Sequence, residues 1–468
     1  MADPSPAGAV AAHPVTAVTA AATYPMTVEQ ESIWLDDALH AGPSRYLESW
    51  VYRLTGQVDR QGVDWAYRQL VRRHEGLRTR YVLAGEDLVQ QVLPADSMPG
   101  LAHRPCSAAE LDAELRSLVR RPLDLAAAPI RGTLLGLASD DVVLVVQLHH
   151  IVADDWALHV LEQEFEACYR AWLAGQPAAL AAAPQPGRYA QAQRQAGPTP
   201  AVRAYWRRQL AGLPADAARS LPPDQPSHPD QPGPGGAQLR FELEPGAGQR
   251  IRAACKALRV TPFVLLAAAT GALLAAGTGS PEVLVGTPVS RRGSAELDRM
   301  VAYLGQVLPL RLRVDPGQSF AELANEVKRV AAEAMVYRDI SAAELTRQLR
   351  RPGAGTPALT RTVLVLDDDA AGPDLPGITA ERLHVPSGVA KYDLLLTLVA
   401  GRRGYQGFLD YDSDRYTYRT ARQLTDRLAA LLDAATRDPH GPRALADVLR
   451  AGAARLDTAP PTAGNGER

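Results

Sequence analysis

Segments with the apolar spacing of a helix and segments with the apolar spacing of a strand follow one another along the chain. Helical spacing is found at 27–40 (TVEQESIWLDDALH), 63–77, 156–175, 251–262, 319–335 and 420–435. Alternating or wholly apolar runs of strand length are found at 46–56, 78–83, 130–137, 141–148, 239–244, 282–290, 307–314, 361–368, 391–400 and 404–412. Because helices and strands interleave throughout, the pattern predicts an α/β fold.

Three stretches rich in Pro, Gly and Ala mark the boundaries of this pattern. Residues 1–23 have no basic start or continuous apolar segment, so we expect a disordered leader rather than a signal peptide. Residues 213–237 (LPADAARSLPPDQPSHPDQPGPGGA) are expected to link two lobes, at 24–212 and 238–450. A second disordered tail is expected at 451–468.

Composition restricts the class of protein without naming a function. Hydrophobic residues make up 46% of the chain and charged residues 22%, as in a globular protein with a substantial core. The net charge of −2 gives no reason to expect nucleic acid or an anionic membrane as a partner. The apolar run at 263–276 is too short for a membrane span and predicts a buried helix. Cys106, Cys168 and Cys255 are too far apart for a disulfide framework, so we expect a cytoplasmic protein.

Candidate chemistry is concentrated at 142–160 (VVLVVQLHHIVADDWALHV). The apolar run predicts a strand covered on both faces, and His149 and His150 follow where it ends. Asp154 or Asp155 is expected to cap the next helix. Imidazole titrates near neutral pH, so a histidine fixed at a strand end is a candidate acid or base. The same residues are also compatible with a purely structural strand end.

Other chemistries find less support in the sequence. His149, His150, Asp154 and His159 are possible metal ligands, but no H-E-x-x-H motif or cysteine cluster supports them, so no metal site is predicted. The sequence contains no G-x-S-x-G nucleophile motif and no phosphate-binding loop.

A series of blocks in the same order resembles the condensation domains of nonribosomal peptide synthetases. The blocks are YPMTVEQESIW, LTGQVDRQGVDWAYRQLVRRHEGLRTRY, RPLDLAAAPIRGTLL, HHIVADDW, AVRAYWRRQLAGLP, SLPPDQP, VLVGTPVSRR, VAYLGQVLPLRLRV and KYDLLLTL. The resemblance covers about residues 24–437. It implies two lobes, each like a chloramphenicol acetyltransferase subunit with a mixed sheet and helices. The lobes would form a V-shaped pseudo-dimer around a central tunnel.

The resemblance also implies an acyltransferase and assigns roles within it. The enzyme would join an acyl or aminoacyl thioester, held on a carrier protein's phosphopantetheine arm, to an amine or hydroxyl acceptor. His150 corresponds to the catalytic histidine and His149 to its supporting neighbour. Asp154 would form a structural pair with Arg292, for which Arg291 is the neighbouring alternative. The tunnel is expected to include Trp156, Tyr303 and Gln306.

Several positions depart from the family pattern. Asp155 stands where the family has glycine, and Ala302, Leu304 and Gln306 replace the usual Gly, Phe and Asn. A noncatalytic relative that recruits tailoring oxygenases carries H-R-x-x-x-D-D, so Asp155 raises a recruitment alternative, which His150 counts against. A soluble acyl-CoA-dependent acyltransferase is a further alternative, disfavoured because no D-F-G-W-G segment is present.

The expected partners follow from this resemblance. They are a carrier protein and a small-molecule acceptor in natural-product biosynthesis, with no tightly bound cofactor and with a monomer sufficient for activity. The absence of adenylation and carrier segments in the sequence suggests a free-standing enzyme. Because carrier proteins are usually acidic, an arginine-rich docking face is expected, with Arg203, Arg207 and Arg208 as candidates and a solvated helix face as the alternative.

Overall fold

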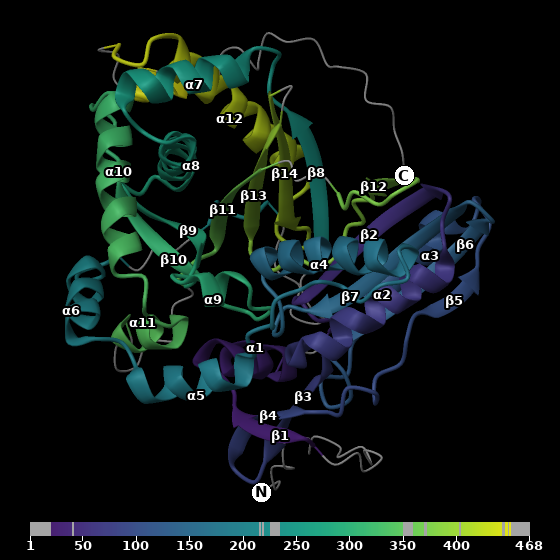
Figure 1. The fold of residues 1–468 in the computed structure, drawn as a ribbon. Helices are drawn as coiled ribbons and strands as arrows, with labels where there is room; N and C mark the ends of the chain where they lie inside the picture. The colour runs from purple at the N-terminus through teal and green to yellow at the C-terminus, as the bar shows by residue number, and fades with distance from the viewer. Residues whose placement is uncertain are drawn as a thin grey trace, which may run out of the picture.

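The computed structural model describes residues 20–39, 42–214, 217, 220–224, 235–349, 359–368, 372–401, 404–441, 445–447 and 449–450. Helices and strands interleave over these residues, and the strands form two large sheets and one small sheet (Figure 1). The mixed α/β fold predicted from the hydrophobic pattern is therefore confirmed.

The first large sheet contains the strand that ends in the two histidines. Its order is β12-β2-β7-β6-β5, in which β5 runs parallel to β6 and the other neighbours are antiparallel. The strands are β2 (Leu47–Gly56), β5 (Ala102–Pro105), β6 (Ile130–Ala138), β7 (Asp141–His149) and β12 (Ile378–Arg382). Strand β7 is buried at every position after Asp141. Helices cover both faces of the sheet, which explains the unbroken apolar run in the sequence.

Three helices pack on this first sheet. Helices α2 (Arg60–Arg73) and α4 (Asp155–Leu173) share a core with one face, and α3 (Leu111–Arg120) shares a smaller core with the other. The first two begin at aspartate caps, since Asp59 accepts from the N–H groups of Gln61 and Gly62 and Asp154 accepts from that of Ala157.

The second large sheet lies in the C-terminal half. Its order is β10-β9-β11-β13-β14-β8, with β11 parallel to β9 and to β13. The strands are β8 (Gly236–Glu242), β9 (Glu282–Ser290), β10 (Gly305–Arg313), β11 (Thr362–Asp368), β13 (Leu394–Gly401) and β14 (Gly404–Asp412). Its helices are α7 (Ala247–Leu258), α8 (Pro262–Thr278), α10 (Phe320–Val336) and α12 (Tyr418–Arg437), which lie together on one side of the sheet (Figure 1).

Helix α8 is the central element of the second core. It is buried almost all the way round, as expected for a helix that is apolar on every side. Thr261 caps its start, Pro262 occupies its first turn, and Gly279 ends it with a φ of 69°. No single helix among the described residues is long and apolar enough to cross a membrane, and α7 with α8 meets that criterion only as a pair bent by 98°.

Smaller elements complete the fold. Strands β1 (Ala22–Pro25), β3 (Thr79–Ala84) and β4 (Asp87–Val92) form the third sheet. The remaining helices are α1 (Val28–Leu39), η1 (Glu75–Arg78), α5 (Pro186–Ala196), α6 (Pro200–Gln209), α9 (Ala295–Asp298) and α11 (Ala342–Leu349). Strand β1 begins at Ala22, before the expected end of the leader at residue 23, because β4 supplies its hydrogen-bond partners. Residues 1–19 and the expected tail at 451–468 lie outside the described residues.

The two halves exchange elements that the sequence pattern did not predict. Strand β12 comes from the C-terminal half but pairs with β2 of the first sheet. Helix α6 lies before the expected linker, yet its Val202, Tyr205 and Trp206 belong to the core of the second sheet. In the expected linker, Ala217 packs against Leu284 of β9. The lobe boundaries predicted from composition divide the chain at 213–237. The hydrophobic core of the second sheet and the pairing of the first sheet each use residues from both sides of that segment.

Candidate active site

The two histidines lie at the end of β7, and the structure gives them different surroundings. His149 is fully buried, and its Nδ1 accepts a hydrogen bond of 3.2 Å from the N–H of Ile151. Its Nε2 is 3.3 Å from Oδ2 of Asp37 and 3.4 Å from Oγ of Ser44. Both ring nitrogens are therefore engaged by the protein, and the supporting role of His149 stays a prediction.

His150 follows in a turn that the protein holds from both ends. Its backbone N–H donates to the carbonyl of Tyr46 at 2.7 Å, and its Nδ1 is 2.6 Å from the carbonyl oxygen of Ala153. A carbonyl oxygen only accepts, so Nδ1 carries the ring proton and the lone pair of the neutral ring is on Nε2. Within the described part of the chain, Nε2 makes no hydrogen bond. A free lone pair on a fixed ring is what a general base requires.

The electrostatic surroundings of His150 favour the neutral ring. Burial lowers its pKa well below the usual value, because the charged imidazolium loses hydration. The positive charge of Lys391 acts in the same direction, whereas the hydrogen bond to Ala153 opposes it. The ring of Tyr303 lies against His150 with the two centroids 4.9 Å apart, so this predicted tunnel residue is placed beside the histidine.

Asp154 and Arg292 form the expected structural pair. Oδ1 of Asp154 caps α4, while Oδ2 accepts from Nη1 of Arg292 at 2.5 Å and from the N–H of Leu304 at 3.0 Å. The guanidinium also donates to the carbonyls of Leu297, Met300 and Ala302. These bonds tie the turn that holds His150 to the segment between β9 and β10.

Arg291, the alternative partner, makes a second link between the two halves. Its Nη1 is 2.9 Å from Oε1 of Glu29 in α1, and its Nη2 donates to Oε1 of Gln306 at 3.0 Å. Gln306 also donates to the carbonyl of Arg338. The neighbouring Gly305 faces Asp154, and successive strand residues point to opposite faces. The side chain of Gln306 is thus held by Arg291 and Arg338, and its place in the expected tunnel stays a prediction.

Trp156, another residue expected in the tunnel, lies at the surface. Its indole is half exposed and donates to the carbonyl of Asp298 in α9 at 2.8 Å. It lines a surface cavity of about 430 Å³ together with residues of α2, α4 and α9, and His150 is not among the lining residues. The indole points outward because it follows Asp155 on the first turn of α4, where the carbonyl of Asp298 satisfies its N–H.

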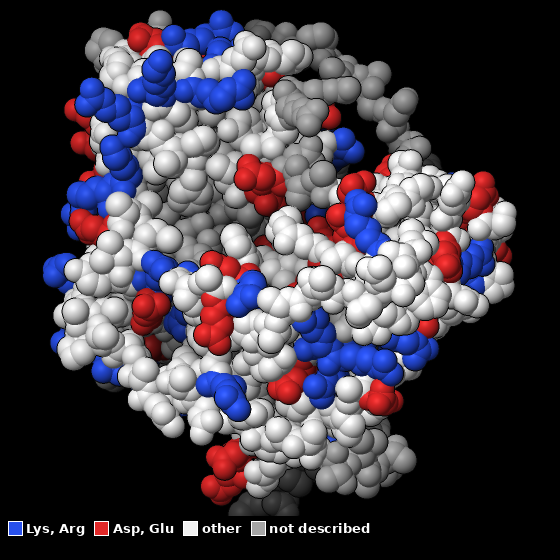
Figure 2. Space-filling model, in the orientation of Figure 1, with Lys and Arg blue, Asp and Glu red and all other residues white. Residues whose placement is uncertain are grey.

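Asp155 occupies the first position of α4, and its side chain is exposed. Burial and the charge of Asp154 nevertheless raise its pKa. Figure 2 shows this face of the molecule hollowed between the part containing α4 and the part containing α10.

Two residues of this region were missed as site residues in the sequence. Glu48 lies on β2 on the same face as Trp50 and Tyr52, toward α4, and burial raises its pKa to about 7. Lys391 precedes β13, and its Nζ lies 5.2 Å from the centroid of the Tyr46 ring. The KYDLLLTL block contains Lys391, but only the tertiary structure brings it to Tyr46.

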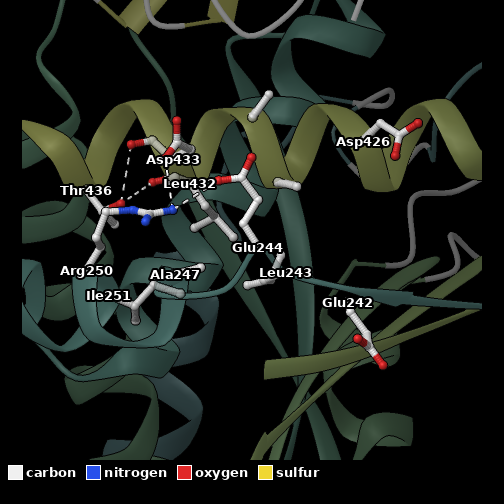
Figure 3. A pocket seen from close by; sticks show the side chains of 12 residues that line it. Glu242, Leu243, Glu244, Ala247, Arg250, Ile251, Asp426, Leu432, Asp433 and Thr436 are labelled. Carbon is white, nitrogen blue, oxygen red and sulfur yellow. Dashed lines mark hydrogen bonds and ion pairs between the residues drawn. The ribbon is translucent and has the colours of Figure 1, made fainter. Parts of the chain in front are cut away.

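A cavity of about 310 Å³ between α7 and α12 is separate from this region (Figure 3). Arg250 is paired there with Asp433 at 3.0 Å and with Glu244 at 3.5 Å. No histidine lines it. Elsewhere in the described part of the chain, no group of three or more His, Cys, Asp or Glu residues is arranged to hold a metal ion.

Comparison with known proteins identifies the family. The family model for the condensation domain matches residues 20–454, which is most of the chain. The chain belongs to the condensation-domain family. It is similar to phosphinothricin tripeptide synthetase PhsC of Streptomyces viridochromogenes, with 30% identity over 89% of this chain and 39% of the relative. It is also similar to a dimodular nonribosomal peptide synthase of Bacillus subtilis, with 30% identity over 89% of this chain and 18% of the relative.

The condensation domain spans well under half the length of these two relatives, so their complete activities do not transfer to it. Among solved structures, the condensation domain of monacolin K polyketide synthase MokA matches with a TM-score of 0.78 and 21% identity, covering 90% of this chain and 99% of that one. The complex of the X-domain and OxyB from teicoplanin biosynthesis matches with a TM-score of 0.78 and 24% identity, covering 94% and 99%. These likenesses confirm the expected chloramphenicol acetyltransferase-like fold. The V-shaped arrangement and the tunnel stay predictions.

Proposed function

We propose that this condensation domain joins a carrier-bound acyl or aminoacyl thioester to an amine or hydroxyl acceptor, with His150 as the general base. The observation that carries the proposal is the hydrogen bond between Nδ1 of His150 and the carbonyl of Ala153, which leaves the lone pair on Nε2. The low pKa of the ring keeps that lone pair available at neutral pH.

The reaction needs little more from the protein than a base and the correct placement of the acceptor beside the thioester. Nε2 of His150 accepts the proton of the acceptor as its nitrogen or oxygen forms a bond to the thioester carbonyl carbon. The carbon–sulfur bond then breaks, and the imidazolium returns the proton to the leaving thiolate. The products are an amide or ester and the free thiol of the phosphopantetheine arm. Because the thioester is already activated, no covalent enzyme intermediate is needed, and holding both reactants together supplies further acceleration.

Asp154 and Arg292 have no direct part in this reaction. Every carboxylate and guanidinium bond described for them fixes the segment around His150. Arg207 and Arg208 of α6 are exposed and stay candidates for carrier docking, whereas Arg203 lies 3.5 Å from Glu344. Monomeric and cytoplasmic operation, with the phosphopantetheine arm as substrate tether and no resident cofactor, also stay predictions.

Acyl transfer tests the proposal directly. The protein is incubated with carrier protein loaded with a panel of acyl and aminoacyl groups and with amines and alcohols, and amide or ester products are measured by mass spectrometry. The His150→Ala variant should lose about 10²–10⁴-fold in rate, the usual contribution of a general base. His159→Ala is the matched control, because His159 is exposed on α4 and hydrogen-bonded to Gln163. Condensation by His150→Ala at the rate of the unaltered protein would rule out the role of His150.

Recruitment of an oxygenase is the second candidate function. Asp155 at the glycine position favours it, and the structural likeness to the X-domain of the X-domain–OxyB complex is consistent with it. Stable binding of an oxygenase, with no product from any acyl-carrier substrate, would favour recruitment over condensation.

A further inference from the structure

One basic side chain from the C-terminal half lies beside the histidine turn. Lys391 is in the segment between β12 and β13, and its Nζ lies 5.2 Å from the centroid of the Tyr46 ring. The carbonyl of the same Tyr46 accepts the backbone N–H of His150 at 2.7 Å. Lys391 is therefore connected to the candidate base through a single intervening residue.

The setting of Lys391 is unusual within this protein. Only three of the 50 basic residues are lysines, and the other two, Lys256 and Lys328, are exposed on α7 and α10. Lys391 is partly buried, and burial lowers its pKa. Within the described residues no carboxylate lies within 4.0 Å of Nζ, although the charges of Glu48 and Asp155 act on it. Its positive charge is thus not cancelled by a direct ion pair and acts on the surrounding groups.

The titratable groups around His150 come from every element that packs on the turn. They are Asp37 of α1, Tyr46 and Glu48 at the start of β2, His149 of β7, Asp154 and Asp155 at the start of α4, Arg292 after β9, Tyr303 before β10, and Lys391 and Tyr392 before β13. Glu48, Asp154 and Asp155 are carboxyl groups, which as anions would stabilise an imidazolium. The guanidinium of Arg292 is paired with Asp154, whereas Lys391 and His149 oppose the carboxyl groups by disfavouring a charged ring at His150.

We propose that Lys391 is a positioning residue of the condensation reaction, whose ammonium group, held against the Tyr46 ring, keeps the imidazole of His150 uncharged and able to accept a proton. Two like charges inside a protein repel, so the ammonium of Lys391 disfavours protonation of the His150 ring. The cation–π contact with Tyr46 holds the ammonium in place without neutralising it. The catalytic part of this inference rests on the proposed function, but its electrostatic part does not.

The test replaces the charge and follows His150 itself. In Lys391→Met the stem is retained and the charge is lost, whereas Lys391→Arg retains the charge, and Lys391→Gln provides a second neutral variant. Ring-labelled histidine NMR, with the His150 signal assigned from its loss in His150→Gln, follows protonation between about pH 4 and 8. We expect the titration of His150 to move to higher pH in both neutral variants and to stay near that of the unaltered protein in Lys391→Arg.

The pH dependence of the acyl-transfer rate of the same variants is the second measurement. In Lys391→Met the rate should fall most at acidic pH and approach that of the unaltered protein at alkaline pH, because the ring is then neutral in both. Glu48 has a pKa of about 7 and titrates in the same range, so the comparison is repeated in a Glu48→Gln background, where the same shift is expected. A loss of rate that is equal at every pH would overturn the inference.

The two proposals can fail separately. If the protein transfers no acyl group, the NMR titration still reports whether Lys391 controls the charge of His150. If acyl transfer depends on His150 but its titration is the same in Lys391→Met and in the unaltered protein, the inference about Lys391 is wrong and the proposed function stands.

Discussion

Loss of the Arg292 side chain should destabilise the protein strongly. The Arg292 side chain is only 3% exposed and that of Asp154 only 12%, so the ion pair is largely removed from water. Arg292→Met keeps a similar apolar stem but leaves Oδ2 of Asp154 with only the N–H of Leu304, and leaves the carbonyls of Leu297 and Met300 without this donor. Breaking a buried pair by removing one partner typically costs about 3–5 kcal/mol of unfolding free energy.

Urea denaturation followed by circular dichroism measures this cost, with the free energy of unfolding extrapolated to water. Arg299→Met is the matched control, because Arg299 is exposed at the end of α9, and its expected effect is within about 0.5 kcal/mol. In the double variant Asp154→Asn/Arg292→Met, part of the loss should be recovered, since no carboxylate is then left without its partner. A loss below about 1 kcal/mol in Arg292→Met would refute the view that this pair holds the histidine turn.

Two further predictions concern the pairing of β12 with β2 and the charge of His150. Gly56 at the end of β2 has a φ of 118°, and a Cβ there would lie 2.4 Å from the carbonyl oxygen of Gly377. Gly56→Ala should therefore lower the free energy of unfolding by more than about 1 kcal/mol. The loss should exceed that of Gly85→Ala, because φ is also positive at Gly85 but nothing lies within 4 Å of a Cβ there. Thermal denaturation of the two variants makes this comparison, and equal losses would contradict it. Because the pKa of His150 is lowered in the folded state, its contribution to stability is present above the unfolded value of about 6.5 and is lost as pH falls below that value. The unfolding free energy of His150→Gln should therefore fall less between pH 7 and pH 5 than that of the unaltered protein, and an equal fall would exclude His150 as a source of this pH dependence.

The sequence was most informative where local patterns repeat over many residues. The apolar run before His149 predicted a covered strand, and β7 is that strand. The helical spacing at 27–40 and the apolar run at 263–276 predicted helices, and α1 and α8 are found there. The ordered blocks predicted the condensation-domain family, which is confirmed. These features are local, because periodicity and caps act within a few residues.

Features that depend on contacts between distant segments were predicted poorly. Strand β12 has only five residues and no strong alternation, and it is a strand because β2 offers it an edge. The contacts of Trp156 and Gln306 were likewise not predicted. The indole of Trp156 donates to the carbonyl of Asp298, and the amide oxygen of Gln306 accepts from Arg291, at the other end of the segment between β9 and β10.

By itself, the sequence determined most of the longer elements, the family and the histidine motif, because hydrophobic period and residue type are properties of short segments. Only the tertiary structure decided which nitrogen of His150 carries the proton, and that Lys391 would lie beside the turn. Both depend on atoms brought together from far along the chain, and a charge or a hydrogen bond acts over a few ångströms of space, whatever the distance in sequence.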